Sequence, residues 1–386
     1  MSGTGQQTKW QTPPGWRLVL LDWWAARRNA LLGSRRFQLW AGRFPLTRPI
    51  ARRQAGDLFD LCAGFVYSQV LFAVVQLRLC ELVSDGPQQL SSLARHAALP
   101  EDRMARLLDA AVSLRLLERR GEARYGLGPL GAVLVQNQGI KAMVRHHALF
   151  YRDLNDPLSL LRGDVRQTGL TRYWPYADSM AAHDLDSAQV GAYSELMAVS
   201  QNLIAAEVLN AYSLARHRCL LDVGGGTGAF LSAVAGRWPH LRLMLFDLPA
   251  VIGQAGPHLP SGEPGQRLQV FGGDFFVDPL PPGADIVSLI RVLHDHNDDD
   301  ALRLLRAICS SLPDGGTLLL AEPMAGHRES DRVANAYFGF YLMAMGKGRA
   351  RSPVQIGSLL RRAGFSGHRL LANPMPLQTR IIVASK

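Results

Sequence analysis

A glycine-rich turn follows an apolar segment at residues 219–228, which have the sequence Cys-Leu-Leu-Asp-Val-Gly-Gly-Gly-Thr-Gly. The apolar residues predict a buried strand, and residues 229–238 have the spacing of a helix. Gly224, Gly225 and Gly226 permit positive φ angles and a close approach of the backbone to a ligand. The pattern therefore predicts that a nucleotide-like ligand binds where the strand ends and the helix begins.

Two classes of cofactor fit this turn. Gly224, Gly226 and Ala229 satisfy the dinucleotide fingerprint, and Asp247 lies about twenty residues further on, where an acid would bind a ribose diol. Asp222, however, ends the strand just before the turn and would repel an anionic pyrophosphate. A carboxylate at this place suits the positive sulfonium and ammonium groups of S-adenosylmethionine. Asp222 therefore favours S-adenosylmethionine over a nicotinamide dinucleotide.

His294 is a second candidate for chemistry, because it follows the apolar run at residues 285–293. A histidine there could accept the proton of a hydroxyl group as the oxygen attacks a methyl sulfonium. Glu322 ends the next apolar run and could orient the imidazole through a hydrogen bond, whereas His296 is expected to point elsewhere. The acidic run at residues 297–300 precedes a helix and is better explained as its N-cap and first turn than as a metal site.

Strands and helices alternate around these residues. Predicted strands cover residues 219–223, 242–246, 268–272, 285–290 and 317–322, with helices at 229–238, 250–256, 300–312 and 354–363 and a closing hairpin at 367–372 and 378–385. This order predicts an α/β fold with a doubly wound, mostly parallel sheet. Ligands bind such sheets beyond the carboxyl ends of the strands.

The part of the chain before the sheet has mainly helical patterns. Residues 58–83 predict one helix that is apolar almost all round, and its polar positions favour burial in a core or subunit interface over a membrane span. Residues 90–125 predict a winged helix, made of helix, turn, helix and a small β-wing. Its second long helix offers few side chains that could read DNA bases, so no nucleic-acid partner is expected. Further helices are expected over residues 140–215, around an aromatic loop at 171–176.

Size and composition are those of an ordinary globular protein. The chain has 386 residues, of which 47% are hydrophobic and 19% charged, which is enough for two domains. Its four cysteines are widely spaced in apolar contexts and predict buried thiols in a reducing cytoplasm. The start of the chain does not have the pattern of a signal peptide.

Residues 1–57 differ from the rest of the chain in charge. They hold ten lysines and arginines against Asp22 and Asp57, together with five tryptophans, in a chain whose net charge is +10. Arginine and tryptophan on an amphipathic stretch suit the headgroup layer of an anionic membrane. An arm that packs its tryptophans on a partner subunit and leaves its arginines solvated is an equal alternative.

Several motifs together resemble one family. In order they are Leu221-Asp-Val-Gly-Gly-Gly-Thr-Gly, Phe246-Asp-Leu-Pro, Gly273-Asp-Phe-Phe, Arg291-Val-Leu-His-Asp, Asp314-Gly-Gly with Glu322-Pro, and Arg362-Ala-Gly-Phe. They resemble the S-adenosylmethionine-dependent O-methyltransferases of the acetylserotonin and caffeate type over residues 58–386. The resemblance implies a Rossmann-like class I methyltransferase domain with a mostly parallel seven-stranded sheet, preceded by a helical winged-helix dimerisation domain.

The resemblance also assigns roles to residues. It implies that His294 is the catalytic base, that Asp247 and Asp274 bind the ribose and adenine, and that Phe275 stacks on the adenine. The implied S-adenosylmethionine site comprises Asp222, Gly224, Gly225, Gly226, Asp247, Leu248, Gly273, Asp274, Phe275 and Arg291. Residues near family substrate positions could line an apolar channel or be plain core: Tyr151, Trp174, Tyr341 and Met345.

One position departs from the family pattern. Many members have a second glutamate flanking the histidine, in a Gly-x-Glu-Arg-Thr run, whereas this chain has Ala350 in the sequence Gly348-Arg-Ala-Arg-Ser. Alanine cannot orient a base. Glu322 must then orient His294 alone, or the substrate of this chain requires less help.

The N-terminal segment resembles one group of enzymes within this family. Residues 35–37, 43–52 and 58–67 are similar to those of the carotenoid hydroxyl methyltransferases of photosynthetic bacteria, which act on 1-hydroxycarotenoids on the way to spheroidene. This similarity implies a homodimer that methylates a carotenoid tertiary hydroxyl. Another hydrophobic pigment, such as a bacteriochlorophyll precursor, is the alternative substrate, and a winged-helix regulator with a ligand-sensing domain is the alternative function.

Three domains are expected on this basis. Residues 1–57 would form a basic, tryptophan-rich arm, residues 58–205 the winged-helix dimerisation and substrate domain, and residues 206–386 the catalytic domain. Since a long polyene dissolves in membranes, a cytoplasmic protein with peripheral contact to the inner or photosynthetic membrane is expected.

Overall fold

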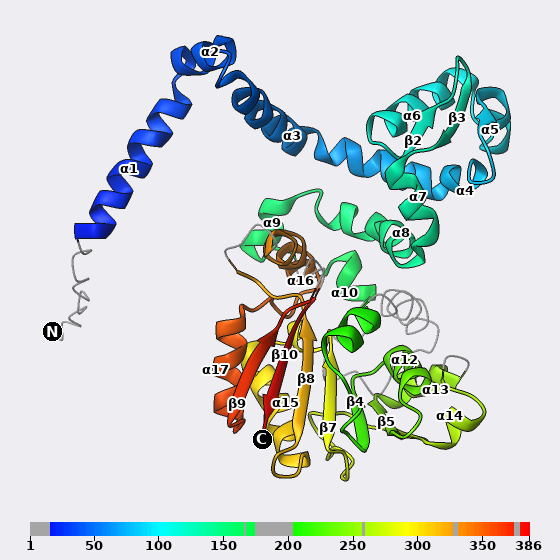
Figure 1. Ribbon diagram of the computed structural model, residues 1–386, viewed down its shortest axis with the longest axis vertical. Coiled ribbons are helices and arrows are strands. Elements are labelled where there is room, and N and C mark those ends of the chain that lie inside the picture. The colour runs from blue at the N-terminus through cyan, green and yellow to red at the C-terminus, as the bar shows by residue number, and fades with distance from the viewer. Residues whose placement is uncertain (1–15, 166, 174–203, 257–258, 327–330, 374–378) are drawn as a thin grey trace. The chain divides into compact units, whose positions relative to one another are not determined.

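Figure 1 shows the computed structural model of the chain, which describes residues 16–165, 167–173, 204–256, 259–326, 331–373 and 379–386. The chain forms two compact units, Met1–Leu71 and Phe72–Lys386. Helix α3 (Arg48–Gln76) begins in the first unit and ends in the second, with no break at residue 57. The domain boundaries expected after residues 57 and 205 stay predictions.

The first unit leaves most of its large apolar side chains exposed. Helix α1 (Trp16–Gly33) buries none of its residues, and α2 (Arg35–Arg43) buries Ala41. The rings of Phe37, Trp40 and Phe44 follow one another along α2 and its C-terminal cap, with centroids 5.7 and 5.1 Å apart. A largely exposed aromatic row therefore lies on a helix that also carries arginines.

Helix α3 has 29 residues and is long and apolar enough to cross a membrane, by length and composition alone. Its large side chains from Leu58 to Phe65 are exposed, and Val74 and Val75 are its buried residues. The expected burial in a core is therefore wrong for most of this helix, and burial in a subunit interface stays a prediction. The single helix expected over residues 58–83 is wrong. Arg78 adopts a left-handed φ of 54°, which ends the first helix and starts the short helix α4 (Leu79–Leu82).

The expected winged helix is present in the second unit. Its helices α5 and α6 are followed by a wing of strands β2 and β3, and β1 pairs with the other edge of β3, so that all three strands are antiparallel. Met104, Leu108 and Ala111 of α6 point into the core, at the spacing of one helix face. The bounds are β1 (Gln88–Gln89), α5 (Leu90–His96), α6 (Glu101–Ser113), β2 (Leu117–Arg119) and β3 (Arg124–Leu127).

Four helices follow the wing within the described part of residues 129–173. They are α7 (Pro129–Gln136), α8 (Gln138–Asp153), α9 (Pro157–Arg162) and α10 (Gly169–Tyr173). The carboxylate of Asp153 accepts the backbone N–H groups of Gly169 and Leu170 at 2.7 and 2.9 Å, which ties α10 to the end of α8. Residues 204–211 are also helical, and most of the expected helix at 186–209 lies outside the described residues.

A seven-stranded sheet forms the centre of the remaining chain, in the order β6-β5-β4-β7-β8-β10-β9. The first five strands in this order are parallel, and β10 is antiparallel to both of its neighbours. The direction of strand order reverses between β4 and β7, where doubly wound sheets bind ligands. The bounds are β4 (Cys219–Val223), β5 (Arg242–Asp247), β6 (Leu268–Gly272), β7 (Ile286–Ile290), β8 (Thr317–Glu322), β9 (Gly367–Leu371) and β10 (Arg380–Ser385). The predicted mostly parallel sheet is confirmed.

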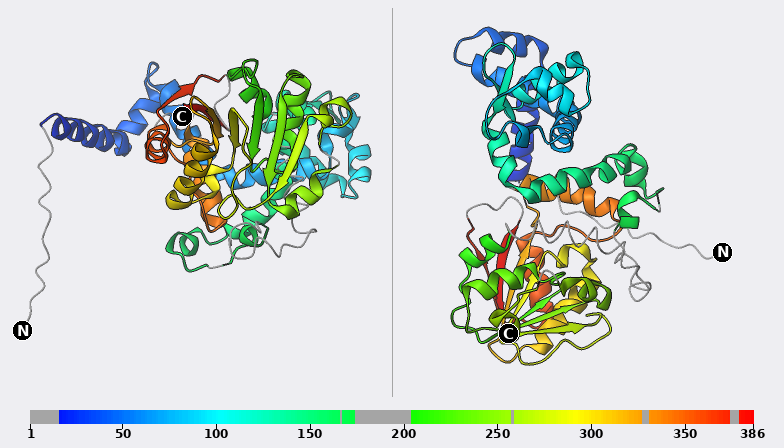
Figure 2. Two further views of the ribbon diagram at one scale, coloured as in Figure 1. Left: turned by 90° about the horizontal axis from the view of Figure 1, so that it is seen from below. Right: turned by 90° about the vertical axis from the view of Figure 1, so that its right-hand side faces the viewer.

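Helices cover both faces of this sheet, as Figure 2 shows. Leu221 and Val223 of β4 pack in the core beneath α15 and α17, whereas Leu220 packs in the core beneath α12 and residues 204–211. Since side chains alternate along a strand, Asp222 lies on the same face as Leu220. The flanking helices are α12 (Ala229–Arg237), α13 (Pro249–Ala255), α14 (Glu263–Gln266), α15 (Asp298–Ser311) and α17 (Pro353–Ala363).

Candidate active site

The glycine turn connects β4 to α12 and touches the loop that follows β7. Gly224 and Gly226 have φ angles of 66° and 60°, which residues with side chains rarely adopt. A Cβ atom on Gly224 would lie 2.8 Å from Cγ2 of Val292, and one on Gly225 would lie 2.4 Å from Oδ2 of Asp222. Both positions therefore exclude a side chain, and the turn packs directly on the neighbouring loop.

Asp222 is buried beneath this turn with one carboxylate oxygen satisfied. Its Oδ1 accepts the Ser288 hydroxyl at 2.6 Å, whereas Oδ2 has no hydrogen-bond partner among the described residues. Burial raises the pKa of Asp222 to about 7, the charge of Asp247 acts in the same direction, and the Ser288 hydroxyl opposes the shift. A buried carboxylate with one open oxygen, next to a glycine cradle, fits the positive groups of S-adenosylmethionine.

Asp247 ends β5 and is tied to the same turn. Its Oδ2 accepts the backbone N–H of Gly226 at 2.7 Å, and its Oδ1 accepts that of Leu248 at 2.7 Å. Burial raises the pKa of Asp247 to about 6, and the two backbone hydrogen bonds oppose the shift. Each carboxylate oxygen can accept a second hydrogen bond, so Asp247 is able to bind a pair of hydroxyls. Its assignment to ribose, and that of Leu248 to the cofactor site, stay predictions.

The loop after β6 lies beside Asp247. Gly273 donates its N–H to the backbone oxygen of Asp247 at 3.0 Å. Asp274 is buried, and its Oδ1 accepts the backbone N–H of Phe276 at 2.8 Å. The structure thus brings the expected cofactor residues of three neighbouring strands to one sheet edge. The role of Asp274 toward adenine stays a prediction.

Phe275 belongs to an aromatic group next to this loop. Its ring packs edge-on against Phe276 and His296, with centroids 4.7 and 5.6 Å away. Burial is the main cause that lowers the pKa of His296 to about 3, so this ring is neutral. The ring of His296 packs against the two phenylalanines. Stacking of Phe275 on adenine stays a prediction.

His294 lies in the 3-10 turn η3 (Leu293–Asp295), just beyond the end of β7. Its Nδ1 is 2.6 Å from Oε2 of Glu322, at the end of the neighbouring strand β8. The other oxygen of Glu322 accepts the backbone N–H groups of Val292 and Leu293 at 3.0 and 2.7 Å. The expected hydrogen bond is therefore confirmed. With Nδ1 directed at Glu322, Nε2 is the nitrogen that can accept a proton from a substrate.

Asp295, for which no role was expected from the sequence, belongs to the same buried group. Its Oδ1 is 3.3 Å from Nε2 of His294. Burial raises the pKa of Asp295 to about 6, and the charge of His294 opposes this shift. For His294, burial disfavours the charged ring, but the carboxylates of Asp295 and Glu322 outweigh burial and raise its pKa. Two acids thus favour the protonated form of His294.

Arg291 is the first residue after β7 and acts on the charge of His294. Its φ of 58° is left-handed, and its N–H is donated to the backbone oxygen of Ala321 at 2.8 Å. The guanidinium carbon is 5.6 Å from the centroid of the Phe338 ring. The positive charge of Arg291 opposes the rise in the pKa of His294. Arg291 therefore acts on the electrostatics of His294, and its expected place in the cofactor pocket stays a prediction.

Aromatic side chains from two consecutive helices pack beside His294. The ring of Phe338 lies 5.9 Å from that of His294, at nearly a right angle. Tyr337 and Tyr341 stack on each other with centroids 5.8 Å apart. The helices are the π-helix η5 (Val333–Phe338) and α16 (Gly339–Ala344).

Helix α8 supplies two histidines to this aromatic group. Nε2 of His146 is 2.8 Å from the hydroxyl of Tyr341, and Nε2 of His147 is 2.9 Å from that of Tyr337. Burial lowers the pKa of both histidines, that of His146 to about 4. The group is therefore uncharged near neutral pH and presents mostly apolar surface. The sequence carries no local signal for these pairs, because about half the chain separates their members.

The four expected substrate residues have different surroundings. Tyr341 belongs to the aromatic group, and the ring of Tyr151 lies 5.9 Å from that of His147. Met345 is buried in the hydrophobic core that includes Phe338. This placement agrees with the alternative that Met345 is a core residue. Trp174 lies outside the described residues. Contact of any of them with substrate stays a prediction.

The acidic run at residues 297–300 begins a helix. Oδ1 of Asn297 accepts the N–H of Asp300 at 2.9 Å, and three aspartates occupy the first turn of α15. The expected N-cap is therefore confirmed. Within the described ranges, no three His, Cys, Asp or Glu side chains group as metal ligands would.

Comparisons with known proteins agree with this geometry. The O-methyltransferase domain matches residues 151–366, and the O-methyltransferase dimerisation domain matches residues 59–137. The chain is 44% identical to demethylspheroidene O-methyltransferase of Cereibacter sphaeroides over 354 residues, covering 92% of this chain and 93% of the relative. It is 41% identical to the protein of the same name from Rhodobacter capsulatus, covering 89% and 85%.

A solved structure extends the likeness to three dimensions. Human N-acetylserotonin methyltransferase, crystallised in complex with SAM, aligns with a TM-score of 0.73 and 27% identity, covering 86% of this chain and 98% of that one. The matched domains contain both the winged helix and the strand ends that carry Asp222, Asp247, His294 and Glu322. The chain therefore belongs to the O-methyltransferase family, with a dimerisation domain ahead of its catalytic domain.

Proposed function

We propose that this chain methylates the tertiary hydroxyl of a 1-hydroxycarotenoid, giving a 1-methoxycarotenoid, with His294 as the general base. The cofactor of this O-methyltransferase is S-adenosylmethionine. The substrate class rests on one observation: the chain is 44% identical, over 92% of its length, to a demethylspheroidene O-methyltransferase. The uncharged aromatic group beside His294 supports a substrate that is largely apolar.

The cofactor and the base would be neighbours in this site. S-adenosylmethionine supplies a methyl group bound to a positively charged sulfur. The open oxygen of Asp222 would pair with a positive group, and Asp247 would accept hydroxyl hydrogen bonds. Because Gly224 packs on Val292, two residues before His294, a ligand on the glycine turn lies close to the base loop.

His294 would act while the new bond forms. A tertiary alcohol is too weak an acid to ionise first, so Nε2 takes the hydroxyl proton as the oxygen bonds to the methyl carbon and the carbon–sulfur electron pair returns to sulfur. Glu322 and Asp295 stabilise the resulting imidazolium, which then releases the proton to water. Close positioning of the two reactants supplies much of the rate.

An assay with defined pigments tests the substrate. The purified protein is incubated with methyl-labelled S-adenosylmethionine and either a 1-hydroxycarotenoid, the same carotenoid without the hydroxyl, or a bacteriochlorophyll precursor. We expect label in a methyl ether of the 1-hydroxycarotenoid alone, identified by mass spectrometry. Label in the bacteriochlorophyll precursor and none in the carotenoid would overturn the proposal.

We also infer that residues 16–57 bind an anionic membrane, in which such a polyene is dissolved. The guanidinium carbons of Arg17 and Arg27 lie 5.4 and 4.9 Å from the ring centroids of Trp16 and Trp23. Cations therefore lie next to aromatic rings on this helix, an arrangement that suits the headgroup layer. This inference locates the protein in the cytoplasm, at the inner or photosynthetic membrane.

Removing residues 1–47, which precede α3, separates a membrane arm from a dimer arm. The match to a dimerisation domain at residues 59–137 supports a homodimer whose contacts lie mostly beyond this deletion. We expect the truncated protein to remain a dimer and to lose co-sedimentation with phosphatidylglycerol vesicles, while it keeps activity on detergent-dispersed carotenoid. The full chain should release from the vesicles at high salt. A truncated monomer would favour the dimer arm, and a truncated dimer that still binds vesicles would contradict both.

A further inference from the structure

We propose that Arg351 is a positioning residue that holds the turn carrying His294 in its working geometry. The proposal rests on the proposed role of His294 as the base. Arg351 is 2% exposed, although it lies in the polar sequence Gly-Arg-Ala-Arg-Ser. It directly follows Ala350, at which the family pattern has a glutamate and this chain has none.

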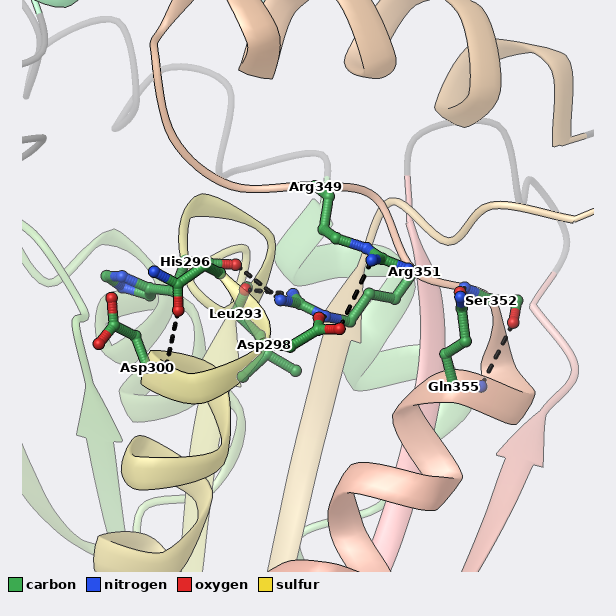
Figure 3. A network of polar contacts seen from close by, with 9 residues as sticks. Leu293, His296, Asp298, Asp300, Arg349, Arg351, Ser352 and Gln355 are labelled. Atoms are coloured by element: carbon green, nitrogen blue, oxygen red, sulfur yellow. Dashed lines mark hydrogen bonds and ion pairs between the residues drawn. The ribbon is translucent and has the colours of Figure 1, made fainter. Parts of the chain in front are cut away.

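One guanidinium reaches both ends of the His294 turn, as Figure 3 shows. Nη1 of Arg351 donates to the backbone oxygen of Leu293 at 2.9 Å, and Nη2 donates to that of His296 at 2.7 Å. Nε donates to Oδ1 of Asp298 at 2.8 Å, in the first turn of α15. The residues before and after His294 and Asp295 are thus connected by a single planar group, which limits how far the turn can rotate.

The backbone around Arg351 strengthens this connection. Arg349 donates its N–H to the backbone oxygen of His294 at 2.8 Å. Gly348 has a φ of 90°, and a Cβ there would lie 2.3 Å from the same oxygen. The backbone oxygen of Arg351 accepts the N–H of Ala325, three residues after Glu322, at 3.0 Å. The segment therefore contacts both the turn that holds His294 and the chain that leaves the strand of Glu322.

The energetics favour a positioning role over a purely stabilising one. Burial lowers the pKa of Arg351, and the ion pair with Asp298 opposes that shift. Two of the three acceptors are neutral carbonyl oxygens, and the carboxylate of Asp298 is half exposed. Burying a charge with such partners adds little net stability compared with a packed apolar side chain. The three hydrogen bonds of Arg351 do, however, fix the distance between the turn that carries His294 and the start of α15.

The test uses Arg351→Met, His294→Ala and the double variant, with Arg349→Met as the matched control. Arg349 is a nearby arginine whose half-exposed guanidinium also reaches Asp298, at 3.5 Å. We expect Arg351→Met to lower kcat by about tenfold or more and to leave the KM for S-adenosylmethionine within about twofold. Arg349→Met should retain kcat. In the His294→Ala background, Arg351→Met should cause little further loss, because its effect passes through His294.

A pH profile gives a second readout. Glu322 and Asp295 raise the pKa of His294 through close contacts, so a looser turn should move the acid limb of kcat to lower pH in Arg351→Met. Arg351→Lys, which keeps the charge but cannot span the acceptors, should resemble Arg351→Met more than the native chain. An equal loss of turnover with and without His294, together with an unmoved acid limb, would overturn the proposal.

Two further outcomes separate this inference from the proposed function. If His294→Ala retains turnover, the proposed base is wrong; if His294→Ala is slow and Arg351→Met is normal, only the positioning role is wrong. Should Arg351→Met fail to fold, Asp298→Asn replaces it in the same cycle, since Asp298 is half exposed and removing its charge weakens only one contact of Arg351. We expect Asp298→Asn to lower kcat about two- to fivefold and to move the acid limb in the same direction, and no change in either would overturn the proposal.

Discussion

Asp222 and Glu322 occupy equivalent places at the ends of parallel strands, and both are buried, yet their hydrogen bonding differs. Glu322 accepts three donors, from Val292, Leu293 and His294. Asp222 accepts one, and its Oδ2 has none among the described residues. Glu322 is therefore fully hydrogen-bonded within the protein and holds His294, whereas Asp222 has one oxygen left for the ligand that we propose. Changes at the two strand ends should accordingly separate chemistry from binding.

Loss of His294 should have the largest effect on turnover. His294→Ala is expected to lower kcat by about a hundredfold or more, the usual scale for a general base. The affinity for S-adenosylmethionine, measured by calorimetry, should stay nearly normal because no expected cofactor contact is removed. A variant that keeps kcat within a few-fold of the native value would show that Glu322 and His294 have only a structural role.

Loss of Asp247 should affect the binding of S-adenosylmethionine. Asp247→Ala removes two charge-assisted acceptors and is expected to weaken S-adenosylmethionine binding by about 2–4 kcal/mol, with the fold intact. Calorimetry measures the affinity and circular dichroism the fold. Asp299→Ala, an exposed acid in the first turn of α15, is the control and should bind normally. Equal affinity in both variants would remove Asp247 from the cofactor site.

The pH dependence of kcat at saturating S-adenosylmethionine should report the pKa of His294, which Glu322 contacts. His294 must be neutral to accept a proton, and Asp295 and Glu322 raise its pKa above the ordinary value of 6.5. We therefore expect kcat to fall as pH drops, with a midpoint above 6.5. Glu322→Gln removes one of the two charges and should move this midpoint to lower pH. A midpoint that stays in place would mean that another group titrates.

The pH dependence of the free energy of unfolding should report the protonation of Asp222. We expect this effect to be the smallest of the four. The folded-state pKa of Asp222, about 7, is above its value in the unfolded chain, so this group binds a proton on folding and its contribution to the free energy of unfolding is lost as pH rises toward 7. Saturating S-adenosylmethionine, which favours the carboxylate, should reduce that loss. Thermal unfolding of the native chain and of Asp222→Asn between pH 4 and pH 8 measures the difference. An identical slope for both would assign the proton uptake elsewhere.

Sequence alone predicts the parts of the site that depend on strand ends. The strands are nearly continuous apolar runs, and the rule that parallel strands end at one edge brings Asp222, Asp247, His294 and Glu322 together. These predictions use short stretches of chain and a single topological rule. They therefore needed no knowledge of the packing between distant segments.

The rest of the site depends on contacts between distant segments or on local backbone angles. Asp295 reaches His294 only because the chain forms a 3-10 turn there. The hydrogen bond between His146 and Tyr341 joins α8 to α16, and the burial of Arg351 follows from backbone oxygens that no residue pattern reveals. The apolar periodicity does not predict the helix break at Arg78, since a left-handed residue leaves no mark on that periodicity.

The left-handed backbone of Arg291 links thermal stability to turnover, because one substitution at this position would change both. A residue with a side chain pays about 1–2 kcal/mol for this conformation, which glycine adopts freely. Selection for thermostability alone would therefore favour Arg291→Gly. That change would also remove a cation that holds down the pKa of His294, so fewer molecules would carry a neutral imidazole at pH 7. A thermostabilised variant of this enzyme with glycine at this position would then work best in more alkaline medium.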